Sequence, residues 1–101
     1  MAIVLTARER AHLKARAHSL EPAVQIGQGG LTDKVVAEVD RALKAHELIK
    51  IKILGDDRDE REAISEAVCE RTGAGFVQRV GKVTVLWRPK EEKGDAGDST
   101  P

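Results

Sequence analysis

The chain has 101 residues, of which 41% are hydrophobic and 34% charged, and its formal net charge at neutral pH is +0. This length suits one domain with a single modest core and excludes a cofactor domain followed by a separate substrate domain. The composition argues against wholesale disorder, and a neutral total points to no partner. Because Cys69 is the only cysteine, an intrachain disulfide and a zinc site built from cysteines are excluded as well.

The charges are distributed unevenly along the chain. Residues 1–20 hold four basic side chains against one acidic, whereas residues 91–101 hold four acidic side chains against one basic. The apolar start is too short for a signal peptide, and there is no run of about 18 apolar residues. We therefore expect a cytoplasmic protein without membrane contact, with a folded domain over residues 1–90 and a disordered acidic tail over residues 91–101.

The first helix is predicted over residues 7–17. Thr6 and Glu9 have the spacing of a capping box, in which each side chain accepts a hydrogen bond from a backbone N–H of the other residue. Few apolar residues follow, mainly Leu13, so this helix should rest lightly on the core and expose a basic surface. The next residues, 23–26, predict a short strand.

A glycine-rich stretch, GQGGLT at residues 27–32, joins that strand to a second predicted helix over residues 33–45. Each glycine gives up backbone freedom on folding and adds no side chain to a core. Two interpretations follow: a tight turn that needs positive φ angles, or bare main chain that lets a bulky anion approach. Free N–H groups at a helix start favour phosphate, so the second interpretation needs only cations nearby.

Those cations are offered by the strand predicted over residues 48–54, which alternates strictly between apolar and basic side chains. Its isoleucines share one face, and Lys50 and Lys52 share the other. An acidic turn at residues 55–60 then leads into a third helix, whose apolar face includes the cysteine. Gly73 is well placed to end this helix in the left-handed conformation.

Two last strands, residues 75–80 and 83–87, are joined at Gly81-Lys82, a spacing typical of a tight hairpin. Phe76 and Trp87, the only aromatic residues, are predicted to pack in the core. The element order predicts an α/β fold with three helices and a four-stranded mixed sheet. Strand–helix–strand units favour parallel pairing through crossovers, and the hairpin is antiparallel.

Enzyme and cofactor sites find little support. A Rossmann dinucleotide site would need a glycine where Thr32 stands, and a phosphate-loop NTPase would need Gly-Lys-Ser or Gly-Lys-Thr. His12, His18 and His46 lack the spacing of a metal site, and the acids at residues 56–60 lack the pattern of a calcium loop. No nucleophile has a recognisable catalytic setting. We predict no enzyme, no cofactor, no metal and no small-molecule substrate.

Two long segments combine these features: LTARERAHLKARAHSLEPAVQIGQGGLTDKVVAEVDRALKAHELIKIKI and ERTGAGFVQRVGKVTVLWRP. Within them, HLK, GQGGLT, HELIKIKI and GKVTVLWRP follow one another in order. Over residues 5–89 the chain thus resembles the YhbY-like family, the single-domain bacterial members of the CRM (chloroplast RNA splicing and ribosome maturation) domain group. The resemblance implies a fold related to the C-terminal domain of translation initiation factor three, and non-catalytic RNA binding during assembly of the large ribosomal subunit.

The family's Gly-x-x-Gly loop maps onto Gly27, Gln28, Gly29 and Gly30. Many relatives place a basic residue between the outer glycines, whereas this chain has neutral ones, so more of the attraction must come from the first helix and the second strand. RNA contact is then expected mainly at phosphates, with ribosomal RNA of a precursor large subunit as the partner. The predicted RNA-binding set is Gly27, Gln28, Gly29, Gly30, Arg8, Arg10, Lys14, Lys50 and Lys52.

These charges also have plainer interpretations. The basic residues of the first helix are typical of a solvated face, and lysines on an exposed strand protect against aggregation. The alternative function is a protein-interaction module that docks through its helices onto another assembly or translation factor. In either case we expect a monomer.

Overall fold

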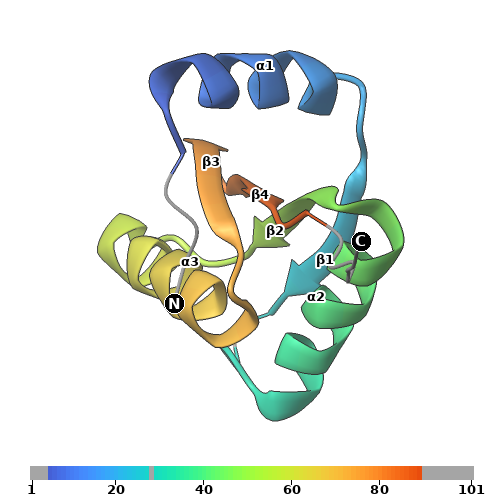
Figure 1. Ribbon diagram of the computed structural model, residues 1–101. Helices are drawn as coiled ribbons and strands as arrows, with labels where there is room; N and C mark the ends of the chain where they lie inside the picture. Colours follow the sequence, from blue (N-terminus) through green and yellow to red (C-terminus); the bar gives the residue numbers. More distant parts are fainter. Residues whose placement is uncertain (1–4, 28, 90–101) are drawn as a thin grey trace.

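The computed structural model describes residues 5–27 and 29–89, and so leaves Gln28 and the predicted acidic tail outside the described residues. The predicted order of helices and strands is confirmed (Figure 1). Strand β1 starts one residue earlier than predicted, at Pro22, a position that a proline can occupy because β1 is an edge strand. The elements are α1 (Ala7–Ala17), β1 (Pro22–Ile26), α2 (Asp33–His46), β2 (Leu48–Ile53), α3 (Arg58–Thr72), β3 (Gly75–Val80) and β4 (Val83–Trp87).

The four strands form one mixed sheet in the order β1-β2-β4-β3. Strands β1 and β2 are parallel, and β4 is antiparallel to both β2 and β3. The antiparallel hairpin and the parallel pairing in the first strand–helix–strand unit are confirmed, but the strands of the second unit, β2 and β3, do not pair, because β4 lies between them. β4 suits this central place because its side chains are buried on both faces, as Thr84, Val85 and Leu86 show.

Helices cover both faces of the sheet. Figure 1 shows α1 on one side and α2 with α3 on the other. The larger core lies under α2 and α3, and a smaller one lies under α1. The larger core contains Val24, Ile26, Val39, Leu43, Ile49, Ile51, Ile53, Val68, Cys69, Ala74 and Leu86, and the smaller one Leu5, Leu13, Ala17, Leu48, Val77 and Val85.

Helix α1 rests lightly on the sheet, as predicted. Only Leu13 and Ala17 are buried along its length. Its capping box is confirmed: the Thr6 backbone N–H donates to Glu9 Oε1 at 2.9 Å, and the Glu9 N–H donates to Thr6 Oγ1 at 3.1 Å. The cap fixes where this helix begins, while most of its surface remains open to solvent.

The two aromatic residues are placed differently. Trp87 packs against the smaller core, in line with its prediction. Phe76 is 38% exposed, so its predicted core position is wrong. It lies on β3, which borders β4 on one side only, and a side chain on an edge strand has neighbours on fewer sides. The buried hydroxyl groups of Ser65 in α3 and Thr84 in β4 share a hydrogen bond, with Oγ and Oγ1 2.8 Å apart.

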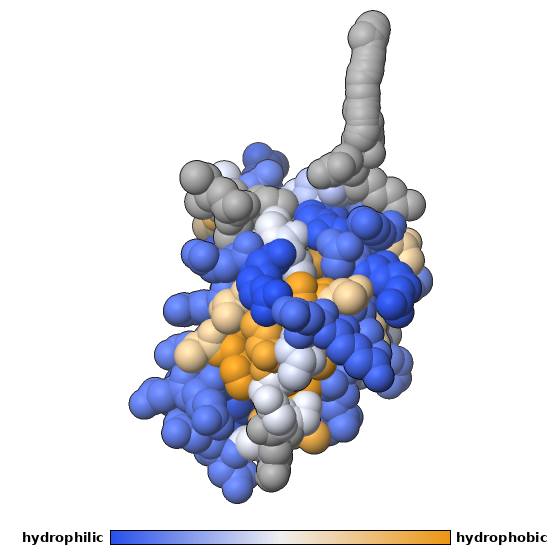
Figure 2. Space-filling model, turned by 90° about the horizontal axis from the view of Figure 1, so that it is seen from below, coloured by the Kyte–Doolittle hydropathy of each residue, from blue (hydrophilic) through white to orange (hydrophobic). Residues whose placement is uncertain are grey.

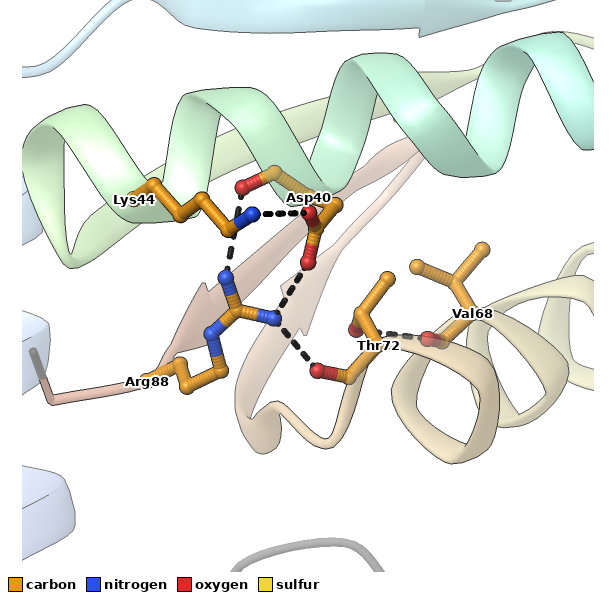
Figure 3. Close-up of polar contacts among 5 residues, drawn as sticks. All are labelled: Asp40, Lys44, Val68, Thr72 and Arg88. Atoms are coloured by element: carbon orange, nitrogen blue, oxygen red, sulfur yellow. Dashed lines mark hydrogen bonds and ion pairs between the residues drawn. The ribbon is translucent and has the colours of Figure 1, made fainter. Parts of the chain in front are cut away.

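Arg88 ties the end of β4 to both helices of the larger layer (Figure 3). Its guanidinium donates to Asp40 Oδ1 in α2 at 2.8 Å and to the carbonyl of Thr72 at the end of α3 at 2.6 Å. A further bond reaches the Asp40 carbonyl at 3.2 Å, and Lys44 Nζ lies 3.2 Å from the same carboxylate. We call this cluster of Asp40, Lys44, Thr72 and Arg88 the arginine clamp.

Candidate functional site

The glycine loop, residues 27–32, leads from β1 into α2. The Gly30 N–H donates to the Gly27 carbonyl at 3.0 Å and closes a turn. Thr32 caps α2, since its Oγ1 accepts from the Val35 N–H at 3.2 Å. The positive end of α2 therefore begins directly at the loop, which is the arrangement that favours an anion.

The turn accounts for only one of the described glycines in this loop. Gly30 has φ +77°, a conformation that favours glycine. Gly27 and Gly29 have no such angle, and a Cβ atom built on either would meet no described atom within 4 Å. The folded chain therefore has room for larger residues at both positions, and the fold alone does not require glycine there.

Lys50 and Lys52 lie on the α1 side of the sheet, opposite the isoleucines buried under α2 and α3. Lys52 pairs with Gln25, just before the glycine loop. Lys50 is closer to α1, and its Nζ donates to the Leu20 carbonyl beyond the end of that helix at 2.9 Å. Both are half-buried, so their stems pack on the sheet while their charges face the solvent.

The basic residues of α1 point in different directions, because successive residues of a helix are rotated by about 100°. Arg16 lines a hollow with Leu48 and His46, on the side where β2 begins. Lys14 and Arg10 are rotated away from Arg16, onto the other flank of the helix. Arg8 projects from the outer surface, away from the sheet. The structure thus places Lys50 and Lys52 together on one face of β2, while the basic residues of α1 are distributed around the helix.

Arg10 differs from the other basic residues of this helix. It is half-buried beside the stripe that holds Leu13 and Ala17, whereas Arg8 and Lys14 are exposed. Its Nε is buried and has no hydrogen-bond partner among the described residues. A buried donor without a partner costs free energy. We call Arg10, Lys14, Lys50 and Lys52 the cationic side.

A feature that the sequence prediction missed lies on the other side of the glycine loop. Gly27, Gly29 and Gly30 line a hollow of about 500 Å³ together with residues of the turn before α3 and its first two turns. Its acidic members are Asp56, Asp57 and Glu60. Because β1 and β2 are parallel, their C-terminal ends meet at one edge of the sheet, and this pairing was the signal that could have predicted the contact.

The acids of this hollow have structural partners as well. Asp57 caps α3, accepting from the N–H groups of Asp59 and Glu60 at 2.9 and 3.3 Å. The acidic turn predicted before the third helix therefore stabilises the start of that helix. The glycine loop is nevertheless flanked unequally, with carboxylates on the α3 side and ammonium groups on the α1 side. The carboxylates therefore disfavour a polyanion on the α3 side.

The side of the molecule that carries α2 and α3 differs from the α1 side in its surface. Figure 2 views this side, where apolar side chains gather in the middle and hydrophilic ones surround them. Leu31, Val35, Ala42 and Ile64 are partly buried here against the larger core.

In the described ranges 5–27 and 29–89, no helix is long and apolar enough to cross a membrane, and no group of three or more acidic, histidine or cysteine side chains could hold a metal ion.

Comparisons with known proteins agree on one family. Residues 5–88 match the protein family described as CRS1 / YhbY (CRM) domain. An RNA-binding protein of Haemophilus influenzae is 44% identical over 88 residues, which are 87% of this chain and 89% of that protein. Probable RNA-binding proteins of Pseudomonas aeruginosa and Bacillus subtilis are 37% and 32% identical, and the matches cover 90% and 88% of this chain and 89% and 93% of theirs.

A solved structure shares the fold. The solution structure of a hypothetical protein from Staphylococcus aureus superposes with a TM-score of 0.78 at 31% identity. The superposition covers 89% of this chain and 94% of the other. The order of helices and strands is therefore a property of related chains as well.

Proposed function

Because the chain belongs to the CRS1 / YhbY (CRM) domain family, we propose that it is a non-catalytic RNA-binding protein. The RNA would contact the glycine loop and the cationic side, Arg10, Lys14, Lys50 and Lys52. The related proteins named for RNA binding support the class of partner. The geometry described above supports the surface.

One observation supports this surface most strongly: Gly27 and Gly29 are not required by the fold. A backbone without side chains at the start of α2 lets phosphate oxygens reach the N–H groups, which carry the positive end of the helix dipole. The lysines beside it neutralise further phosphates along the same strand of RNA. The acidic hollow on the α3 side limits the approach to one direction.

Such contacts recognise the backbone and shape of RNA rather than its sequence. Phosphate contacts fix position and orientation, and their affinity falls steeply with salt because bound counterions are released. We further propose that the RNA is ribosomal RNA in a precursor of the large subunit, and that binding assists assembly in the cytoplasm. This finer role rests on the family resemblance of the glycine loop and the flanking motifs.

Substitution of the two unconstrained glycines tests the surface. Gly27→Val and Gly29→Val should each keep the melting temperature of the wild type, since the space is open. Each should lower RNA affinity about tenfold or more, because a hydrogen bond to a charged phosphate contributes about 1.5–3 kcal/mol. Filter binding and thermal melting measure the two effects. Gly30→Val is the matched control and should lower the melting temperature, because its φ is positive.

Sedimentation tests the partner. The protein should move with precursor large-subunit particles in a sucrose gradient and leave them after RNase treatment. Co-sedimentation that survives complete digestion of the RNA would instead support the protein-interaction module. Equal sedimentation with small-subunit particles would contradict the large-subunit role and leave RNA binding itself intact.

A further inference from the structure

We propose that the uncovered half of the sheet, on the α1 side, contacts the bases and riboses of unpaired RNA nucleotides. This inference rests on the proposed function and deepens it, because it assigns a chemical role to side chains outside the predicted RNA-binding set. The site is one row of four side chains, one from each strand. We call it the cross-strand row, and it consists of Gln25, Lys52, Val83 and Val80.

Strand register places these four residues side by side. Gln25 pairs with Lys52, Lys52 with Val83, and Val83 with Val80. Neighbouring strands lie about 4.8 Å apart, so the row crosses the sheet over about 14 Å. Because successive side chains of a strand alternate between faces, the row faces away from the core that contains Val24.

Helix α1 does not cover this row. The helix packs on the half of the sheet where β2 begins, and it buries Leu48, Val77 and Val85 there. In the cross-strand row, by contrast, Gln25 is exposed and Lys52 and Val83 are half-buried. Val80 is 62% exposed, the largest exposure among the large apolar side chains of the described residues.

The chemistry of the row changes from one edge of the sheet to the other. It consists of an amide beside the glycine loop, an ammonium group on β2 and aliphatic side chains on β4 and β3. A surface for phosphates alone would be cationic or hydrogen-bonding throughout. An amide both donates and accepts hydrogen bonds, as base edges and ribose hydroxyls require, and valine suits the apolar face of a base or sugar.

The RNA at this row should be single-stranded. In an RNA duplex the bases are stacked inside and the major groove is too narrow for side chains, so an amide and a valine reach bases only where nucleotides are unpaired. Lys52 belongs to the row and to the cationic side, and only Ile26 separates Gln25 from the glycine loop. An RNA strand held at the loop therefore continues directly onto the row.

The test compares a short single-stranded RNA with a duplex of the same length, each titrated over a range of salt concentrations. Val80→Ser and Gln25→Ala should each weaken binding of the single strand about three- to tenfold, through lost apolar burial and lost hydrogen bonds. The slope of log affinity against log salt should stay unchanged, because no phosphate contact is lost. Lys52→Gln should instead reduce that slope by about 0.7.

Phe76→Ser is the matched control. This substitution also removes an exposed apolar side chain from β3. Phe76, however, pairs with Leu86, which belongs to the core on the other side of the sheet. The substitution should leave binding unchanged. Unchanged single-strand affinity in either Val80→Ser or Gln25→Ala would overturn this inference alone. Absence of RNA binding by the wild-type protein would overturn the proposed function with it.

Discussion

The double variant Lys14→Glu, Lys52→Glu is expected to bind RNA on the order of a hundredfold more weakly than the wild type at about 0.1 M salt. Each phosphate contact contributes about five- to tenfold to affinity under these conditions, and the introduced carboxylates add repulsion. One substitution lies on α1 and the other on β2, so the effect tests whether both elements face the same RNA. Filter binding with ribosomal RNA measures it.

The matched control is Arg16→Glu, Arg41→Glu, which changes the net charge by the same amount. Arg16 faces the hollow where β2 begins, and Arg41 is exposed on α2 beyond the edge of β1. This variant should lose much less affinity. An equal loss in both double variants would show that net charge attracts RNA without a defined surface, and would contradict the assignment of the cationic side.

Removing the arginine clamp is expected to destabilise the fold strongly. Arg88→Met keeps a long apolar stem but leaves the Thr72 carbonyl without this donor and removes the shorter of the two ion pairs of Asp40. The arginine is only 18% exposed, so water replaces these bonds poorly. Losing a charge-assisted network of this kind costs about 2–4 kcal/mol. The melting temperature should fall by about 10 °C or more, since each kcal/mol corresponds to about 4–8 °C in a small domain.

Two comparisons isolate the clamp. Arg71→Met breaks an exposed ion pair with Asp33 and should change stability by less than about 1 kcal/mol. An equal loss of stability in Arg71→Met and Arg88→Met would contradict a special role for the clamp. Acid titration of the wild type supplies the second comparison.

The hydrogen bond from Arg88 holds the pKa of Asp40 below its usual range, with burial opposing and Lys44 assisting. Because the folded pKa is the lower one, the clamp contributes its full stability above the unfolded pKa of about 3.9. That contribution is lost as the pH falls through the folded pKa. Asp40→Asn should remove this part of the acid sensitivity, which urea unfolding at several pH values would measure.

Local sequence patterns predict most of this fold. The capping box at Thr6, the alternation in β2 and the left-handed glycine at the end of α3 each depend on neighbours within a few residues, and Gly73 has the expected φ of +74°. Cys69 is buried as predicted, and burial raises its pKa to about 11. The place of β4 between β2 and β3 depends instead on which strands pair with each other. The periodicity of the sequence does not show that pairing.

The candidate site is predicted less completely. The glycines and strand lysines follow from spacing and alternation, and they lie on adjoining parts of the structure. Lys14 and Arg16 lie on opposite flanks of α1, and their surroundings become known only when the packing of α1 on the sheet is known. The carboxylates near Gly27 come from a segment about thirty residues away, and only strand pairing brings them to the loop. The order of charges along a chain therefore predicts a charged surface only when the pairing of the strands is also known.

The central position of β4 has a consequence for how the chain acquires its structure. During synthesis, residues 83–87 emerge last among the helices and strands, yet they join β2 to β3. Until they appear, β3 has no hydrogen-bonded neighbour, and both cores lack the side chains that β4 contributes, Leu86 in the larger and Val85 in the smaller. Such long-range pairing slows folding. The domain is thus completed in one late step, when its final strand closes the gap between the two halves.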